Sequence, residues 1–234
     1  AGMGYWDELK LHYNALAREG LSVEFVNQSS DLTGYGLVVV PMVYLLTDAF
    51  AKKLCDFAQN GGTVVVTYWT GVVDESDLCR LGDTPYGLTD LLGLRRTEID
   101  GMYDGEVRRC IPADGSGLPE AQASALCEVA ALNGTDPAAP LSFYAEDYYE
   151  GSPAAAVHPY GKGRAYYLAS RFDEAFYRAF YHRAASEAAL ASAWPEPLPD
   201  GVLAVRRGGF VFVQNCTEQS VTINGTGVGR YRTA

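Results

Sequence analysis

Residues 37–71 constrain the fold most, because they read as two buried strands joined by a helix. Residues 37–41, Leu-Val-Val-Val-Pro, are an apolar run typical of a strand buried on both faces of a parallel sheet. Thr47 can cap the helix that follows, and a Gly-Gly pair ends it. Residues 63–67, Thr-Val-Val-Val-Thr, form the second strand, parallel to the first through a right-handed crossover. We therefore expect a doubly wound α/β fold.

The turn after the second strand, residues 67–71, has the sequence Thr-Tyr-Trp-Thr-Gly. The strand–helix–strand unit resembles class I glutamine-amidotransferase-like (flavodoxin-like) folds, in which this turn carries a cysteine nucleophile in a Cys-x-Gly setting. Trp69 holds that place here. Because an indole cannot attack a carbonyl, Trp69 marks a degenerate nucleophile elbow, and we expect the fold without its usual chemistry.

Composition indicates a soluble globular chain. With 234 residues and 48% hydrophobic content, the chain is long enough for one domain and a small appendage. Its formal net charge of -11 argues against nucleic acid or an anionic membrane as partner. No apolar run approaches the roughly 18 residues of a membrane span, and no signal peptide is visible, so we expect a cytoplasmic protein.

The cysteines and histidines show no ligand spacing, so we expect neither a structural metal nor a cofactor. We interpret the five cysteines as reduced thiols: Cys55, Cys79, Cys110, Cys127 and Cys216. A surviving Cys-His enzyme is disfavoured, because Cys55 lies in mid-helix and Cys79 lies beyond the elbow. A nucleotide-binding module is disfavoured because the chain has no G-x-G-x-x-G or Walker A pattern. The Gly-Lys-Gly at residues 161–163 joins two strands and is better explained as a hairpin turn.

Residues 5–17 predict an amphipathic helix. Its inner side is expected to carry Trp6, Leu9, Tyr13 and Leu16. Residues 22–26 alternate as a strand. A doubly wound sheet normally begins with a strand before the first helix, and this chain has none there. We therefore expect a piece cut from something longer, with a substituted strand or a rearranged strand order.

The middle of the chain gives weaker signals. Residues 88–93 predict a short helix and residues 95–99 a strand, whereas residues 112–140 read as an irregular excursion. Within it, residues 121–132 have helical composition but could equally be a strand.

The pattern sharpens again from residue 141. Three closely spaced strands are expected at residues 141–145, 154–157 and 164–169. They are followed by a helix over 173–193, a proline-rich linker over 194–200, and a small antiparallel module with strands at 202–205 and 210–214 and a candidate third at 220–223.

Several short motifs, in this order and spacing, carry a resemblance to a known family: Gly34-Tyr35, Val40-Pro41, Gly61-Gly62-Thr63, Leu91-Leu92-Gly93, Gly151-Ser152-Pro153-Ala154, residues 160–167, Gly201-Val202 and Asn215-Cys216-Thr217. The chain resembles the C-terminal half of a glycoside hydrolase family 42 β-galactosidase. The resemblance implies that residues 1–195 are a trimerisation domain and residues 199–234 the start of a C-terminal β domain. The β module stops at residues 230–232, before the closing strands that the resemblance leads us to expect.

The same resemblance implies a homotrimer, with two catalytic glutamates on a TIM barrel that is absent from this chain. The fragment would then be non-catalytic and would meet a galactoside only through the parent enzyme. The alternative is a stand-alone carbohydrate-binding module, motivated by the 16 tyrosines.

The acidic and aromatic loop at residues 145–150 is the remaining candidate site. Glu146, Asp147, Tyr148 and Tyr149 could bind sugar through ring stacking and hydrogen bonds. The competing interpretation is a solvated loop between strands. If the loop has a role, we favour contact with a neighbouring subunit at or near the barrel mouth.

Overall fold

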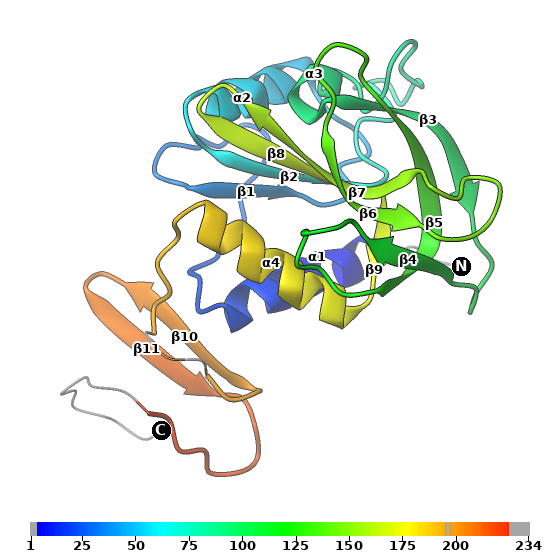
Figure 1. Cartoon of the computed structure of the whole chain (residues 1–234). Helices are drawn as coiled ribbons and strands as arrows, with labels where there is room; N and C mark the ends of the chain where they lie inside the picture. Colours follow the sequence, from blue (N-terminus) through cyan, green and yellow to red (C-terminus); the bar gives the residue numbers. More distant parts are fainter. Residues whose placement is uncertain (1–3, 195, 197, 225–234) are drawn as a thin grey trace.

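The fold is built on one mixed sheet of nine strands (Figure 1). A computed structural model describes residues 4–194, 196 and 198–224. Three adjacent strands at one side of the sheet are parallel: β1 (Leu37–Val40), β2 (Thr63–Thr67) and β8 (Gly163–Leu168). The others pair antiparallel: β3 (Leu94–Gly101), β4 (Arg108–Pro112), β5 (Ala121–Leu132), β6 (Ala139–Tyr144), β7 (Pro153–Tyr160) and β9 (Ser170–Phe172). The expected parallel arrangement is therefore limited to three strands.

The strand–helix–strand unit is confirmed. The valines at residues 64–66 of β2 are completely buried, because β2 has a strand on each side and helices above and below. The connecting helix, α2 (Asp48–Gln59), begins after Thr47, whose hydroxyl oxygen accepts a hydrogen bond from the Phe50 N–H at 3.2 Å. The order along this side of the sheet is β1, β2, β8, so β1 is the edge strand.

The turn at residues 160–163 joins β7 and β8 as an antiparallel hairpin, as predicted. An added Cβ at Gly163 would lie 2.1 Å from the Gly62 carbonyl oxygen, so only glycine fits where β8 begins. The Lys162 N–H donates to the Gln59 carbonyl at 3.1 Å and ties the turn to the end of α2. The Gly-Lys-Gly sequence therefore makes a tight turn.

The prediction of an irregular excursion over residues 112–140 is wrong. Residues 121–132 form β5, a strand of 12 residues, so the strand alternative is correct. β5 pairs with β3, β4 and β9, and this pairing overrides the helix propensity of its alanines. The short helix α3 (Thr89–Leu92) ends as predicted at Gly93, which is left-handed.

Helices cover both faces of the parallel strands (Figure 1). α2 and α3 lie on one face, and α1 (Tyr5–Arg18) and α4 (Glu174–Glu187) lie on the other. α4 ends six residues before the predicted position 193, because the chain turns left-handed at Ala189 (φ 51°). Among the described residues, no helix is both long enough and apolar enough to cross a membrane.

The predicted inner face of α1 is partly wrong. Leu16 is buried, but Trp6 is 69% exposed, and the inward positions nearer the start of the helix belong to Glu8 and His12. These two polar residues are buried because partners from other elements satisfy them, a condition that apolar periodicity cannot reveal.

Residues 22–26 do not form the predicted strand. They run without a strand partner from α1 toward β1. Their contacts lead instead to the C-terminal hairpin, where the Ser22 hydroxyl accepts from the Arg206 N–H at 3.0 Å and donates to the Arg206 carbonyl at 3.2 Å.

The C-terminal module is a hairpin of two strands, β10 (Val202–Arg207) and β11 (Phe210–Asn215), paired antiparallel as predicted. Residues 220–223 form no strand, so the candidate third strand is wrong. The expected stop of the module at residues 230–232 lies outside the described residues.

Candidate functional site

The turn after β2 carries Trp69, the residue predicted to stand at a degenerate nucleophile elbow. Trp69 is left-handed, with φ at 61°, which is a strained conformation for a residue other than glycine. The Thr67 hydroxyl oxygen accepts from the Met42 N–H at 2.8 Å and fixes the base of the turn. The Trp69 ring stacks on Tyr44, with centroids 5.7 Å apart. The indole therefore packs where a nucleophile would otherwise be presented.

Glu128 of β5 holds this turn through hydrogen bonds. Its Oε1 accepts from the Trp69 N–H at 2.9 Å and from Arg96 Nη1 at 2.7 Å, and its Oε2 accepts from the Tyr167 hydroxyl. Glu128 is fully buried, and burial raises its pKa against the lowering effect of the Arg96 guanidinium. The carboxylate joins β2, β3, β5 and β8 in one hydrogen-bonded group, so its role is to hold the turn.

A second buried carboxylate, Glu8, joins α1 to the sheet and to α4. It accepts from the hydroxyls of Tyr68 and Tyr177 at 2.8 and 2.9 Å and from Arg171 Nε at 2.7 Å. Burial raises its pKa, but the hydrogen bond and charge of His12, together with the hydrogen bonds from Arg171 and Tyr68, outweigh burial and lower the pKa to about 2. Glu8 is thus an ionised structural anchor.

Sequence reasoning missed both carboxylates. Glu128 lies in the segment whose structure was ambiguous, and Glu8 lies among polar residues of an amphipathic helix. Nothing in their local sequence distinguishes them from exposed glutamates, because their partners come from distant parts of the chain.

The acidic loop at residues 145–150 is tied to β4 by its carboxylates. Glu146 Oε1 accepts from the Arg109 backbone N–H at 2.5 Å, and Asp147 Oδ2 accepts from Arg108 Nε at 3.2 Å. Both carboxylates are therefore engaged in holding the loop.

The two tyrosines of the loop reach β3 instead. The Tyr148 hydroxyl donates to Glu98 Oε1, and the Tyr149 hydroxyl donates to Asp100 Oδ2, each at 2.8 Å. Tyr149 is 3% exposed and Tyr148 is 65% exposed. The bond to Glu98 raises the pKa of Tyr148 to about 12, and burial is the main cause of the raised pKa of Tyr149. The loop is thus fastened to β3 and β4, with one aromatic ring turned to solvent.

Within the described ranges, no cluster of three or more His, Cys, Asp or Glu side chains is placed to hold a metal ion. All five cysteines are free thiols. Burial raises the pKa of Cys55, which is the opposite of what activates a thiol nucleophile.

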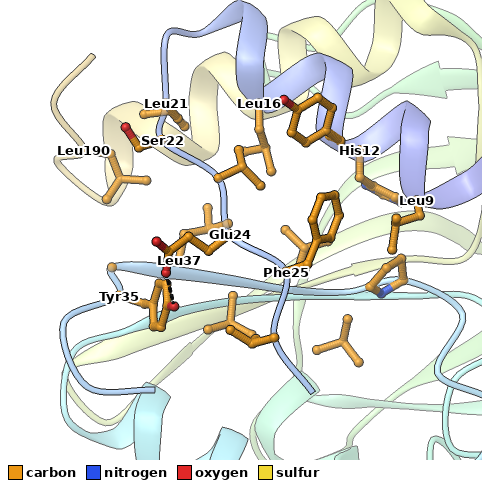
Figure 2. Close-up of a pocket in the computed structure, with 18 of the residues that line it drawn as sticks. Leu9, His12, Leu16, Leu21, Ser22, Glu24, Phe25, Tyr35, Leu37 and Leu190 are labelled. Carbon is orange, nitrogen blue, oxygen red and sulfur yellow. Dashed lines mark hydrogen bonds between the residues drawn. The ribbon is translucent and has the colours of Figure 1, made fainter. Parts of the chain in front are cut away.

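A groove whose lining includes neither Trp69 nor the acidic loop lies beside α1 (Figure 2). It is an open groove of about 840 Å³ between α1, residues 21–28 and β1. Its lining is mainly apolar, with Leu9 and Leu16 on one side and Leu37 on the other.

Fold and site together define a mixed α/β domain with a left-handed tryptophan after β2, a fastened acidic loop and an open sheet edge. A family model described as the β-galactosidase trimerisation domain matches residues 1–191. The chain belongs to this family, the trimerisation domain of glycoside hydrolase family 42 β-galactosidases.

Individual relatives agree with this assignment. The chain is 43% identical to β-galactosidase BglY of Alicyclobacillus acidocaldarius and 34% identical to β-galactosidase Pbg of Clostridium perfringens. In each case the match covers 94% of this chain and 32% of the relative, so the chain spans about a third of their length. The solved β-galactosidase of Rahnella sp. R3 superimposes with a TM-score of 0.87 at 40% identity, over 92% of this chain and 32% of that one.

Proposed function

We propose that this chain is the non-catalytic trimerisation portion of a β-galactosidase that hydrolyses terminal β-D-galactosides. The observation that carries the proposal is the family match over residues 1–191, in a chain that corresponds to about a third of its relatives. The catalytic barrel and its glutamate pair would then belong to another part of the parent polypeptide.

The chemistry of the described residues supports a scaffold. Trp69 offers no nucleophile, and Glu8 and Glu128 are buried and saturated with hydrogen-bond donors. Glu146 and Asp147 are engaged within their loop. A retaining glycosidase needs an acid and a nucleophile about 5 Å apart on rigid elements, free to meet a substrate.

We assign residues 1–195 to an amidotransferase-like, flavodoxin-like trimerisation domain and residues 199–234 to part of a β domain. The β1–α2–β2 crossover supports the first assignment, and the β10–β11 hairpin supports the second. The net charge of -11 supports protein partners over nucleic acid or membranes, and the five free thiols support a cytoplasmic location.

We assign the acidic loop to a contact with a neighbouring subunit. Tyr148 supports this role, because its ring is 65% exposed while its hydroxyl is held by Glu98. An exposed aromatic ring on a fixed backbone loses little conformational freedom on binding, a property that favours interface positions.

Light scattering coupled to size exclusion at micromolar concentration tests the proposal. A trimer has three times the chain mass of 25.3 kDa, about 76 kDa. We expect that mass for the chain, and a shift toward monomer for Tyr148→Ala at unchanged thermal stability. A monomer at every concentration would contradict the proposal.

A stand-alone carbohydrate-binding module is the second candidate, favoured by exposed tyrosine rings at Tyr148 and Tyr103, 65% and 83% exposed. Calorimetric titration with galactose and lactose separates the two candidates. Saturable heat that Tyr148→Ala abolishes would support sugar binding. If no saturable heat is measured, the scaffold role is favoured.

A further inference from the structure

The outer edge of β1 has backbone N–H and C=O groups that no described strand pairs with. The Gly36 carbonyl accepts from the Thr63 N–H at 3.0 Å, so this residue faces β2. Because successive residues of a strand face opposite sides, the N–H and C=O of Leu37 and Val39 point away from β2 and into the groove. No described strand pairs with that side of β1.

The opposite wall of the groove, formed by residues 22–26, also has no strand partner among the described residues. Residues 22–26 run alongside without forming a strand, and Phe25 is 64% exposed although it lies over the groove (Figure 2). The Glu24 carboxylate, which is among the polar groups lining this wall, accepts from the Tyr35 hydroxyl at 2.6 Å. The groove therefore combines exposed apolar side chains with free backbone groups of β1, which is the combination that an added strand satisfies.

The direction of α1 is compatible with a strand that lies in the groove and leads into the helix. Figure 2 shows Leu37, at the start of β1, near the Leu21 end of α1, whereas Leu9 lies at the opposite end. α1 therefore runs antiparallel to β1. A strand that lay in the groove parallel to β1 would end beside the first turn of α1, where Tyr5 lines the groove. That is the order of strand and helix in a doubly wound sheet.

We propose that the groove binds one extended apolar segment of about five or six residues, paired as a parallel strand with the free edge of β1. The segment that fills it is polypeptide preceding α1 in the longer β-galactosidase, and this source rests on the proposed function. Such a strand would pair with Leu37 and Val39 on one side and reach residues 22–26 on the other. It would also cover Leu9, Leu16 and Phe25.

The chain can be tested directly with a peptide in place of that strand. The probe is Thr-Val-Val-Val-Thr, the sequence of the fully buried β2, flanked by two lysines at each end and labelled with a fluorophore. The control peptide carries proline at the central valine, which removes one N–H at unchanged charge. We expect saturable anisotropy for the probe and at least tenfold weaker binding for the control.

Hydrogen exchange locates the binding. We expect the probe to slow exchange at the amides of Leu37 and Val39, and not at the exposed helix residue Lys52. Val39→Pro should weaken probe binding at least tenfold, since it removes a donor that faces the groove; a chain that fails to fold with this change leaves the two peptides and the exchange to decide.

Equal binding of both peptides, or unchanged exchange at Leu37 and Val39, would overturn the inference. Protection of these amides that rises with protein concentration without any peptide would assign the groove to a second copy and would overturn it too. Light scattering reports the proposed function separately. If the chain is a trimer that does not bind the probe, strand binding in the groove is refuted and the proposed function stands. If the chain is a monomer that binds the probe, trimerisation is refuted and strand binding stands.

Discussion

At Glu8 a carboxylate lies fully buried on the inner side of α1, with Tyr68, Tyr177 and Arg171 as hydrogen-bond donors. These donors come from the segment after β2, from α4 and from β9, so one side chain fixes three separate parts of the chain to the first helix. Removal of its charge would leave the Arg171 guanidinium without its partner.

We expect Glu8→Gln to lower the free energy of unfolding by about 3–5 kcal/mol, the usual cost of breaking a buried ion pair on one side. Asp7→Asn is the matched control, because Asp7 is an exposed neighbour on the same helix and its change should stay within about 0.5 kcal/mol. Urea unfolding measures both. Similar small losses for the two variants would contradict the anchoring role.

The same residue predicts how stability depends on pH. The pKa of Glu8 is about 2 in the folded chain against a usual 4.5, so its ionised form stabilises the fold by about 3 kcal/mol. This contribution is complete above pH 4.5 and is lost as the pH falls through 2. The stability gap between the natural chain and Glu8→Gln should therefore narrow with acidification, and urea unfolding across that range checks it.

The two tyrosines of the acidic loop give a matched pair of changes. Tyr149→Phe should destabilise by about 1–2 kcal/mol, because Tyr149 is buried and its loss leaves Asp100 without that donor. Tyr148→Phe removes the equivalent bond to Glu98 at an exposed position and should cost clearly less. Thermal unfolding compares the two variants. Equal losses of stability would contradict the expectation that the buried Tyr149 hydrogen bond contributes more than the exposed Tyr148 one.

Single residues show where sequence reasoning stops. Thr47 could be placed from the sequence, because a helix cap depends on a few neighbouring residues, whereas the elbow role of Trp69 stays a prediction. Glu8 and Glu128 could not, because their partners lie 163, 169 and 32 residues away along the chain. The functional roles predicted for residues 146–149 stay predictions.

Among the elements, β5 and α4 depend on each other. Asp173 precedes α4, and its Oδ1 accepts from the Phe176 N–H at 3.0 Å while its Oδ2 accepts from the Gln122 N–H of β5 at 2.8 Å. The helix cap and the strand edge thus share one carboxylate, and β5 is held as a strand at a place where its composition allowed a helix.

We expect Asp173→Ala to cost about 2 kcal/mol, at the upper end for a cap, because two backbone N–H donors lose their acceptor. Asp173→Asn retains an oxygen for the cap and should cost clearly less. Thermal unfolding measures both, and an alanine variant as stable as the asparagine variant would contradict the double role.

Local patterns predicted the strands and helices between residues 37 and 67 because those elements are close in sequence. The 22–26 segment was misread because alternation alone cannot show whether a partner strand is present. The doubly wound rule predicts a strand before α1, substituted or in a rearranged order; among the described strands β1 lies at the sheet edge with an open groove beside it.

At the scale of the whole molecule, we expect the isolated chain to hydrolyse no galactoside. Its candidate carboxylates at Glu146 and Asp147 are engaged with Arg109 and Arg108. An assay with nitrophenyl β-galactoside decides this. Turnover above the buffer rate that disappears in Glu146→Gln or Asp147→Asn would place chemistry in this chain and contradict the scaffold.

The contacts of Glu8 also bear on how the chain is made. Arg171 and Tyr177 stand 163 and 169 residues after it, so Glu8 cannot acquire these two partners until nearly all of the sheet has been synthesised. At about 5–20 residues per second, that interval is roughly 8–33 s. Throughout that interval Glu8 lacks two of its hydrogen-bond donors, so α1 can complete its docking only after most of the sheet of this domain has been made.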